Sequence, residues 1–218
     1  LAPVLVDDRR PDWIGPSASS GWTRLPVGSP PGLRRRCRAT THGISLMASS
    51  AGRGESPRVE LIDGQQPFQV GDLEIHPFPV PHDAREPVQF VFSDGRHRLG
   101  VVTDLGSSTP HVERMLTGCD ALVLECNHDA GMLQRGGYPP HLKRRIAGRF
   151  GHLDNAAAAA LLAGLDTSRL QHLIAAHLSQ QNNLPALARS AMAEVLGCAE
   201  QWVGVADQDT GFSWRALI

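Results

Sequence analysis

Five side chains that can bind a metal ion or transfer a proton stand beside apolar segments of the chain. They are His82, Asp104, Glu125, His152 and His177. Imidazole and carboxylate groups are ligands that zinc-type ions accept, and histidine is the usual acid–base group near neutral pH. One histidine at a strand end is more often structural than functional. Five such positions in one chain therefore indicate a common metal-binding site.

Short β-rich segments precede four of these residues and predict the strands that position them. These four segments are 73–78, 99–103, 121–124 and 173–176. A fifth segment, 88–92, is joined to 99–103 by a turn at Ser93-Asp94-Gly95. Helices are expected over about 110–116, 155–165 and 185–196, with Thr109 and Asp154 as N-caps of the first two. Alternating strands and helices predict an α/β layered domain, whose functional groups gather at strand ends.

Two details of the C-terminal part are also predicted. The last helix should present one apolar face, formed by Leu184, Leu187, Ala191 and Val195. The final residues should form a hairpin from segments 202–205 and 212–214, with a turn at 209–211.

The first 58 residues differ from the rest of the chain. They are rich in Pro, Gly, Ser and Arg, include the basic run 34–38, and show neither helical nor strand periodicity. We interpret 1–58 as a degenerate or poorly ordered segment, with a nucleic-acid-binding arm as the alternative. Residues 59–218 form the predicted α/β domain.

Composition excludes some classes of protein. The 218 residues include 21 Lys and Arg against 22 Asp and Glu, so a dedicated nucleic-acid scaffold is not indicated. No apolar run reaches the roughly 20 residues of a membrane span, and the start shows no secretory signal pattern. Four scattered cysteines form no C-x-x-C pair and favour reduced thiols. A cytoplasmic protein without membrane association is expected, and the sequence does not specify its oligomeric state.

Several segments, taken in order, resemble those of a known family. They are Val80-Pro81-His82-Asp83, Val102-Thr103-Asp104-Leu105-Gly106, Leu122-Val123-Leu124-Glu125, Gly151-His152-Leu153-Asp154 and Ala176-His177-Leu178-Ser179. The set is similar to the metallo-β-lactamase-fold hydrolases, in particular the single-domain bacterial branch that shares motifs with ribonuclease Z-type phosphodiesterases. The resemblance covers about 59–218. It implies an αββα sandwich whose N-terminal strands are missing or disordered here.

The resemblance also implies a mechanism. His82, Asp104 and His177 would be metal ligands, with Asp104 bridging two ions. Glu125 would orient His152, which would protonate the leaving oxygen of a phosphodiester. An intact member would hold two zinc ions, with manganese as another candidate, and would act on a nucleic acid or a smaller phosphodiester. Thioester or lactam hydrolysis would make little use of this proton relay.

The family's first motif, His-x-His-x-Asp-His, does not occur in this chain. By register it should fall just after Val4-Leu5-Val6. There Asp8, Arg10 and Trp13 occupy the three histidine positions. Only Asp12 matches the motif, and the resemblance implies that it would be a metal ligand. Either the protein is a degenerate member, or residues 5–40 are a frameshifted segment, which translation of the other two frames would reveal. We therefore expect one ion or none and impaired hydrolysis. The alternative is an inactive member that acts as a binding module.

Three further groups of residues admit two interpretations each. The basic and aromatic stretch 138–145 could contact a phosphate backbone or could be a solvated helix start. His128 and Asp129 could face a substrate or be structural. Asn182 and Asn183 could line the site entrance or belong to a polar loop.

Overall fold

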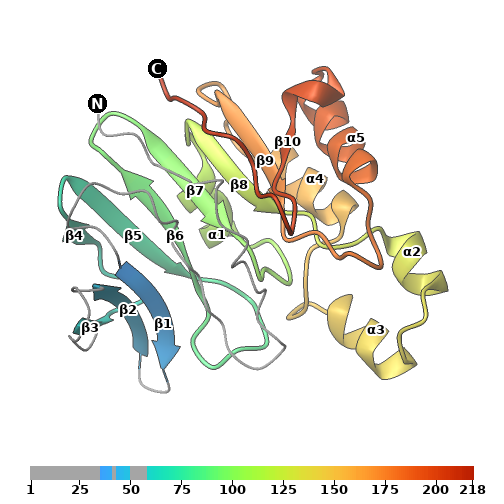
Figure 1. Ribbon diagram of the computed structural model, residues 1–218, viewed down its shortest axis with the longest axis horizontal. Helices are drawn as coiled ribbons and strands as arrows, with labels where there is room; N and C mark the ends of the chain where they lie inside the picture. Colours follow the sequence, from blue (N-terminus) through green and yellow to red (C-terminus); the bar gives the residue numbers. More distant parts are fainter. Residues whose placement is uncertain (1–34, 41–42, 50–57) are drawn as a thin grey trace.

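The computed structural model describes residues 35–40, 43–49 and 58–218, whose strands form two sheets (Figure 1). The smaller sheet has the order β1 (Arg35–Thr40), β2 (Gly43–Ser49), β3 (Arg58–Ile62). The larger sheet has the order β10-β9-β8-β7-β6-β5-β4. Its strands are β4 (Phe68–Val70), β5 (Leu73–Pro79), β6 (Val88–Ser93), β7 (Arg98–Val102), β8 (Ala121–Glu125), β9 (His172–Ala176) and β10 (Gly204–Val205).

Helices connect the later strands of the larger sheet, as predicted. They are α1 (Pro110–Leu116), α2 (Ala130–Arg135), α3 (Pro140–Ile146), α4 (Asn155–Ala163), α5 (Pro185–Leu196) and the 3₁₀ helix η1 (Glu200–Trp202). The predicted caps are confirmed: Thr109 Oγ1 accepts a hydrogen bond from the Val112 amide, and the Asp154 carboxylate accepts one from the Ala157 amide. Among the described residues, no helix combines the length and apolar character needed to cross a membrane.

Strand directions in the larger sheet bring several loops to one edge. β4 to β7 pair antiparallel, whereas β7, β8, β9 and β10 pair parallel. β5 therefore runs in the same direction as β7, β8 and β9, and the carboxyl ends of all four strands lie at the same edge. The predicted β6–β7 hairpin is confirmed, and in its turn Asp94 accepts hydrogen bonds from the amides of Arg96 and His97.

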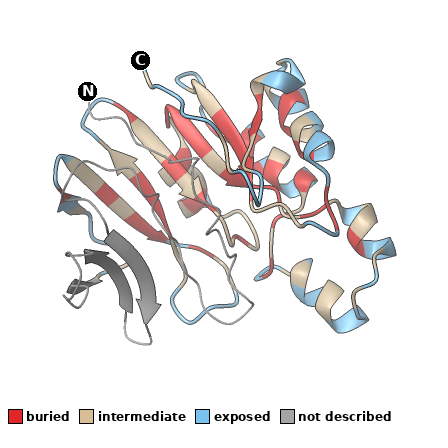
Figure 2. Ribbon diagram, viewed as in Figure 1, coloured by how far each residue is buried: buried red, intermediate tan, exposed pale blue. Residues whose placement is uncertain are grey.

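One large apolar core joins the sheet to the helices, and a smaller one lies around Val70, Ile75 and Phe90. Leu122 and Leu173 from the sheet, Leu116 from α1, Leu162 from α4 and Met192 from α5 all belong to the large core and are at most 2% exposed. Figure 2 shows this buried material concentrated in the central strands and on α4 and α5. Burial of this apolar surface stabilises the sheet, and so holds in place the edge at which the polar residues follow the strands.

The predicted apolar face of α5 was wrong. Leu184, Leu187 and Val195 are exposed, and the buried residues of the helix are Ala188, Met192 and Ala193. Both alanines are small, so α5 can lie close to α4 and β9, and the larger aliphatic side chains are left on the outer face.

The predicted C-terminal hairpin was also wrong. β10 pairs parallel with β9, and residues 212–214 form no strand. Asp207 and Gly211 close the turn by exchanging backbone hydrogen bonds. The tail then runs back along the start of β9, where His172 Nε2 contacts the carbonyl oxygen of Ala216 and the Gln171 side chain accepts from the Ile218 amide. The side chains of Gln171 and His172, at the start of β9, therefore hold this segment, which forms no ladder with β10.

The N-terminal stretch contains strands, although its sequence shows no strand periodicity. β1 and β2 pair antiparallel, with an irregularity between Arg36 and Cys37, and β2 pairs with β3. A bulge breaks the strict alternation of side chains that makes a strand recognisable in a sequence. The boundary expected at residue 58 coincides with the first residue of β3 and stays a prediction.

Candidate active site

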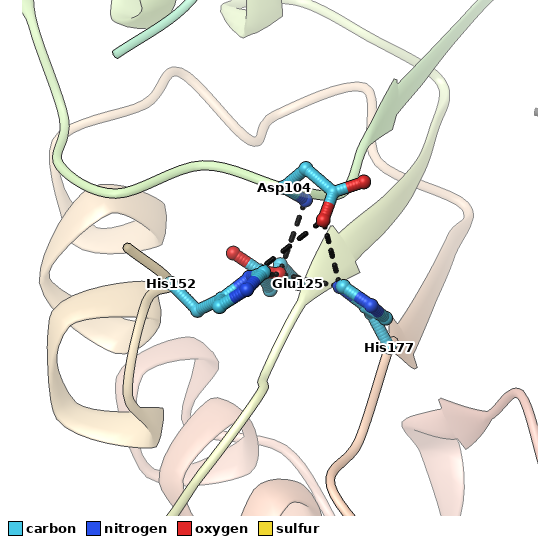
Figure 3. A group of neighbouring side chains, drawn as sticks. All are labelled: Asp104, Glu125, His152 and His177. Carbon is cyan, nitrogen blue, oxygen red and sulfur yellow. Dashed lines mark hydrogen bonds and ion pairs between the residues drawn. The ribbon is translucent and has the colours of Figure 1, made fainter. Parts of the chain in front are cut away.

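The five predicted side chains lie together at the carboxyl edge of the larger sheet. His82 follows β5, Asp104 follows β7, Glu125 ends β8, His177 follows β9, and His152 stands in the loop before α4. Figure 3 shows Asp104, Glu125, His152 and His177 pointing toward one another from these separate elements. The structure thus brings together residues that are up to 95 positions apart in the sequence.

Glu125 is the centre of this arrangement and is fully buried. Its Oε1 accepts hydrogen bonds from the Asp104 amide at 3.0 Å, from His152 Nδ1 at 2.9 Å and from His177 Nδ1 at 2.6 Å. Its Oε2 accepts from the amides of Leu105 and Leu153. A carboxylate offers about four lone-pair positions, so five donors leave Glu125 little capacity to bind an ion.

The charge of Glu125 is stabilised by these donors. Burial is the largest influence on its pKa and raises it, but the hydrogen bonds and charges of His152 and His177 together outweigh burial and lower the pKa to about 2. Glu125 is therefore ionised at neutral pH and can only accept hydrogen bonds. Both histidines must then carry a proton on Nδ1, which leaves Nε2 of each ring for another partner.

His177 responds to the same carboxylate. Burial opposes its protonation, but the hydrogen bond and charge of Glu125, with the charge of Asp104, raise its pKa to about 9. A metal ion bound at Nε2 would take the place of the second proton, because a ligating imidazole must be neutral.

His82 is oriented in a similar way by the backbone. Its Nδ1 lies 2.9 Å from the carbonyl oxygen of Gly151, which can only accept, so Nδ1 carries the proton. Its Nε2 is 3.7 Å from Asp104 Oδ1. The His152 ring lies between those of His82 and His177, with both centroid distances at 5.1 Å.

Backbone strain marks two of the predicted ligands. Among the described residues, Asp104 (φ 56°) and His177 (φ 57°) are the non-glycine residues with positive φ. This left-handed conformation costs an L-residue about 1–2 kcal/mol and persists where the surroundings enforce it. The Asp104 amide donates to Glu125, and the His177 carbonyl accepts from Asn127 Nδ2, so hydrogen bonds hold both turns.

These side chains fit a metal ion. Candidate ligand atoms of Asp104, Glu125, His152 and His177 all lie within 4.8 Å of one another. Since the hydrogen-bonding capacity of Glu125 is already used, Asp104 and His177 are the better donors of this group. His82 lies beside the group, with Nε2 3.7 Å from Asp104 Oδ1. Histidines whose Nδ1–H is held by a fixed acceptor are typical of metal sites. The fourth predicted ligand, Asp12, lies outside the described residues.

The structure adds one interaction that sequence reasoning missed. Asp83 forms an ion pair with Arg145 of α3, and its other oxygen lies 3.5 Å from His82 Nε2. The Arg145 guanidinium hydrogen bond, opposed by partial burial, holds the pKa of Asp83 below its usual value. The only sequence signal was the position of Asp83 directly after His82, which did not predict a partner on a distant helix.

Three of the remaining candidate residues have structural partners. The His128 carbonyl accepts from the Asn155 amide, and the Asp129 carboxylate caps α2 through the Met132 amide. Asn183 is buried and bonds Asn155 and the carbonyl oxygen of Cys126. The structural interpretation therefore suits His128, Asp129 and Asn183 better than contact with a substrate. The buried Nδ2 of Asn182 has no hydrogen-bond partner among the described residues.

The mixed sheet and its edge of histidines and carboxylates are those of a metallohydrolase-type α/β domain. Residues 24–204 match the sequence model of the beta-lactamase superfamily domain. The chain therefore belongs to the beta-lactamase superfamily, and the predicted family and fold class are confirmed.

Two curated relatives have similar sequences. Exodeoxyribonuclease YycJ of Bacillus anthracis is 40% identical over 126 residues, which cover 58% of this chain and 48% of the relative. Exodeoxyribonuclease WalJ of Streptococcus pneumoniae is 30% identical over 154 residues, which cover 71% of this chain and 57% of the relative. The chain thus spans about half the length of these relatives.

Solved structures show the same fold at low sequence identity. The metallo-beta-lactamase fold protein YhfI from Bacillus subtilis has a TM-score of 0.52 and 19% identity, covering 70% of this chain and 54% of that protein. Zn²⁺-bound PqqB from Methylobacterium extorquens has a TM-score of 0.51 and 19% identity, covering 73% of this chain and 56% of that protein.

Replacing Gly151 by alanine should disturb the site through the backbone. A Cβ at this position would overlap the carbonyl oxygens of Arg145 and Ile146, so the segment that carries the His82 acceptor and His152 must shift. We expect a loss of about 1–3 kcal/mol in unfolding free energy and weaker metal binding. Gly137→Ala is the matched control, because nothing lies within 4 Å of its Cβ. Equal urea midpoints for the two variants would contradict the prediction.

Proposed function

We propose that this chain is a metal-dependent phosphodiesterase of the nuclease type, with hydrolysis impaired by the lack of the first ligand motif. The Glu125–His152 pair, 2.9 Å apart and beside Asp104, is the observation that carries the proposal. The exodeoxyribonuclease names of the two relatives support a nucleic-acid substrate.

His82, Asp104 and His177 would hold the ion, for which zinc is the first candidate and manganese the second. When bound, such an ion supplies a water molecule of lowered pKa and neutralises charge on the phosphate oxygens. Asp104 and His177 belong to the group whose ligand atoms lie within 4.8 Å of one another, and His82 Nε2 lies 3.7 Å from Asp104 Oδ1. Three protein ligands are the number that a catalytic zinc takes. A second ion would need further ligands, which the chain lacks at the positions where the family places histidines.

His152 would act as the general acid. Its Nδ1–H is held by the ionised Glu125, so the ring keeps one orientation and presents Nε2 to a substrate. Its side chain is 22% exposed, which allows contact with a bound phosphodiester. A proton delivered from Nε2 would neutralise the leaving alkoxide, and Glu125 would stabilise the imidazolium before that transfer.

A binding module without a dinuclear centre is the second candidate. The replacement of three histidines by Asp8, Arg10 and Trp13 favours it, because arginine stays protonated and indole nitrogen has no free lone pair. In this case the fold would bind a ligand or partner, and the Glu125–His152 pair would have no catalytic task.

Elemental analysis of the purified protein, after dialysis against a weak chelator, should find about one zinc ion per chain. His177→Ala should lose that ion, and His76→Ala, a half-exposed histidine paired with Glu74, should keep it. Turnover of bis(p-nitrophenyl) phosphate and of end-labelled single-stranded DNA should be weak and abolished by a strong chelator. Two ions per chain would show that other residues complete the centre and would overturn the proposed impairment. No ion and no turnover would overturn the proposed hydrolysis and leave the binding-module candidate to be tested.

A further inference from the structure

Besides the run 34–38, basic charge is concentrated in residues 130–150, which we call the basic arm. It comprises α2, α3 and the turns around them, and it contains five basic side chains and no Asp or Glu. They are Arg135, Lys143, Arg144, Arg145 and Arg149. The rest of the chain carries 16 Lys and Arg against 22 Asp and Glu. The basic arm therefore has a sign of charge opposite to that of the remaining molecule.

Packing does not account for this composition. α3 buries none of its residues, and α2 buries only Leu133. Figure 1 shows both helices apart from the sheet, and Figure 2 shows their surfaces as exposed or intermediate. Helices normally bury an apolar face, so two helices that bury one residue between them present most of their surface to solvent.

Most of the cations in the basic arm are available to a ligand. Arg145 is paired with Asp83, and Lys143 Nζ donates to the carbonyl oxygen of Gln134. None of the carboxylates that the structure describes lies within ion-pair distance of Arg135, Arg144 or Arg149. A guanidinium group without a carboxylate partner can bind a phosphate group through two parallel hydrogen bonds.

The basic arm is fixed directly to the candidate active site. The His152 amide donates to the Ile146 carbonyl at 2.9 Å, and Ser107 Oγ, in the loop after Asp104, donates to the Arg149 carbonyl at 3.1 Å. A strand bound along the basic arm would therefore end beside His152.

An exposed aromatic ring stands at the junction of the basic arm and the site. Phe150 is 48% exposed and precedes His152 by two residues. The Arg149 guanidinium lies 4.7 Å from the centroid of its ring. Solvent exposure of a phenylalanine has a cost, and a base stacked on the ring would remove it from water.

We propose that the basic arm binds a single-stranded polynucleotide, whose phosphates contact Arg144 and Arg149 and one of whose bases stacks on Phe150. The inference rests on the proposed function and narrows its substrate from any phosphodiester to a nucleic-acid strand with unpaired bases. A duplex would offer the same phosphates, but its bases are stacked on one another and cannot cover the ring.

The test is the binding of fluorescein-labelled oligonucleotides of about 12 nucleotides, measured by anisotropy on the full chain in a chelating buffer that prevents turnover. Arg144→Ala/Arg149→Ala should weaken binding of single-stranded DNA at least tenfold and lower the salt slope by about 1.4. Phe150→Ala should weaken it about five- to a hundredfold. The matched control is Arg96→Ala/Arg114→Ala, which removes two exposed cations outside the basic arm and should change affinity less than twofold.

Three results would overturn the inference: no binding by the unmodified chain, equal losses in the control variant, or duplex binding as tight as single-strand binding with no effect of Phe150→Ala. The same titration with single-stranded RNA shows whether ribose or deoxyribose is preferred. Tight binding of either RNA or DNA supports the inference. Thermal unfolding confirms that each variant is folded. Since binding is measured without turnover, a chain that binds single strands but hydrolyses nothing would refute the proposed function and leave this inference standing.

Discussion

His152→Ala should lower phosphodiester turnover of the metal-loaded protein by about 10²–10⁴-fold. The ring is held by Glu125 and lies between His82 and His177, so its loss removes the general acid and leaves the predicted ligands in place. Bound zinc, measured by elemental analysis, should stay at the level of the unmodified chain. The rate loss should be smaller for a substrate with a good leaving group such as p-nitrophenolate, because its departure needs little protonation.

His172→Ala is the matched control for this experiment. His172 begins β9, at the end of the strand opposite to His177, and contacts the Ala216 carbonyl. Its removal should leave turnover within about twofold. Unchanged turnover in His152→Ala would count against the nuclease mechanism. Loss of zinc in that variant would instead make His152 a metal ligand.

Glu125→Ala should cost the domain at least about 4 kcal/mol in unfolding free energy. The substitution leaves the amides of Asp104, Leu105 and Leu153 without their acceptor, and each unsatisfied buried donor costs about 1–3 kcal/mol. It also removes the partner of His152 and His177. Urea denaturation followed by circular dichroism measures the change.

Glu125→Gln separates shape from charge in the same position. Glutamine keeps the volume of the side chain, but one of its two terminal atoms is a donor that would face other donors. We expect a loss smaller than that of alanine but still above 1 kcal/mol. Glu194→Ala, an exposed position on α5, should leave the midpoint unchanged. A loss below 1 kcal/mol in Glu125→Ala would show that water replaces the missing acceptor.

Much of the fold was accessible from local sequence patterns. Strands such as β5 and β8 alternate or concentrate apolar residues, and Thr109 and Asp154 stand where an N-cap can accept the first free amides. The gathering of His82, Asp104 and His177 also followed from local information, because strand ends of common direction meet at one edge. Their roles as metal ligands stay predictions.

Other features depend on tertiary contacts that no local pattern encodes. Leu187 and Val195 are apolar but exposed, because Ala188, Met192 and Ala193 form the face of α5 that is buried against the core. The bond from His177 to Glu125 joins residues 52 positions apart. The final segment forms no strand and is held by hydrogen bonds to the side chains of Gln171 and His172. Hydrophobic periodicity describes a single helix or strand, whereas these features depend on which other elements pack against it.

The five donors to Glu125 come from three separate stretches of chain: the turn after β7, the loop before α4 and the turn after β9. Local opening of any one of them would leave a buried anion partly uncompensated, at a free energy near that of losing the whole domain. We therefore expect opening of this sheet edge to be coupled to unfolding of the apolar core, which native-state hydrogen exchange of the Asp104, Leu105 and Leu153 amides would measure.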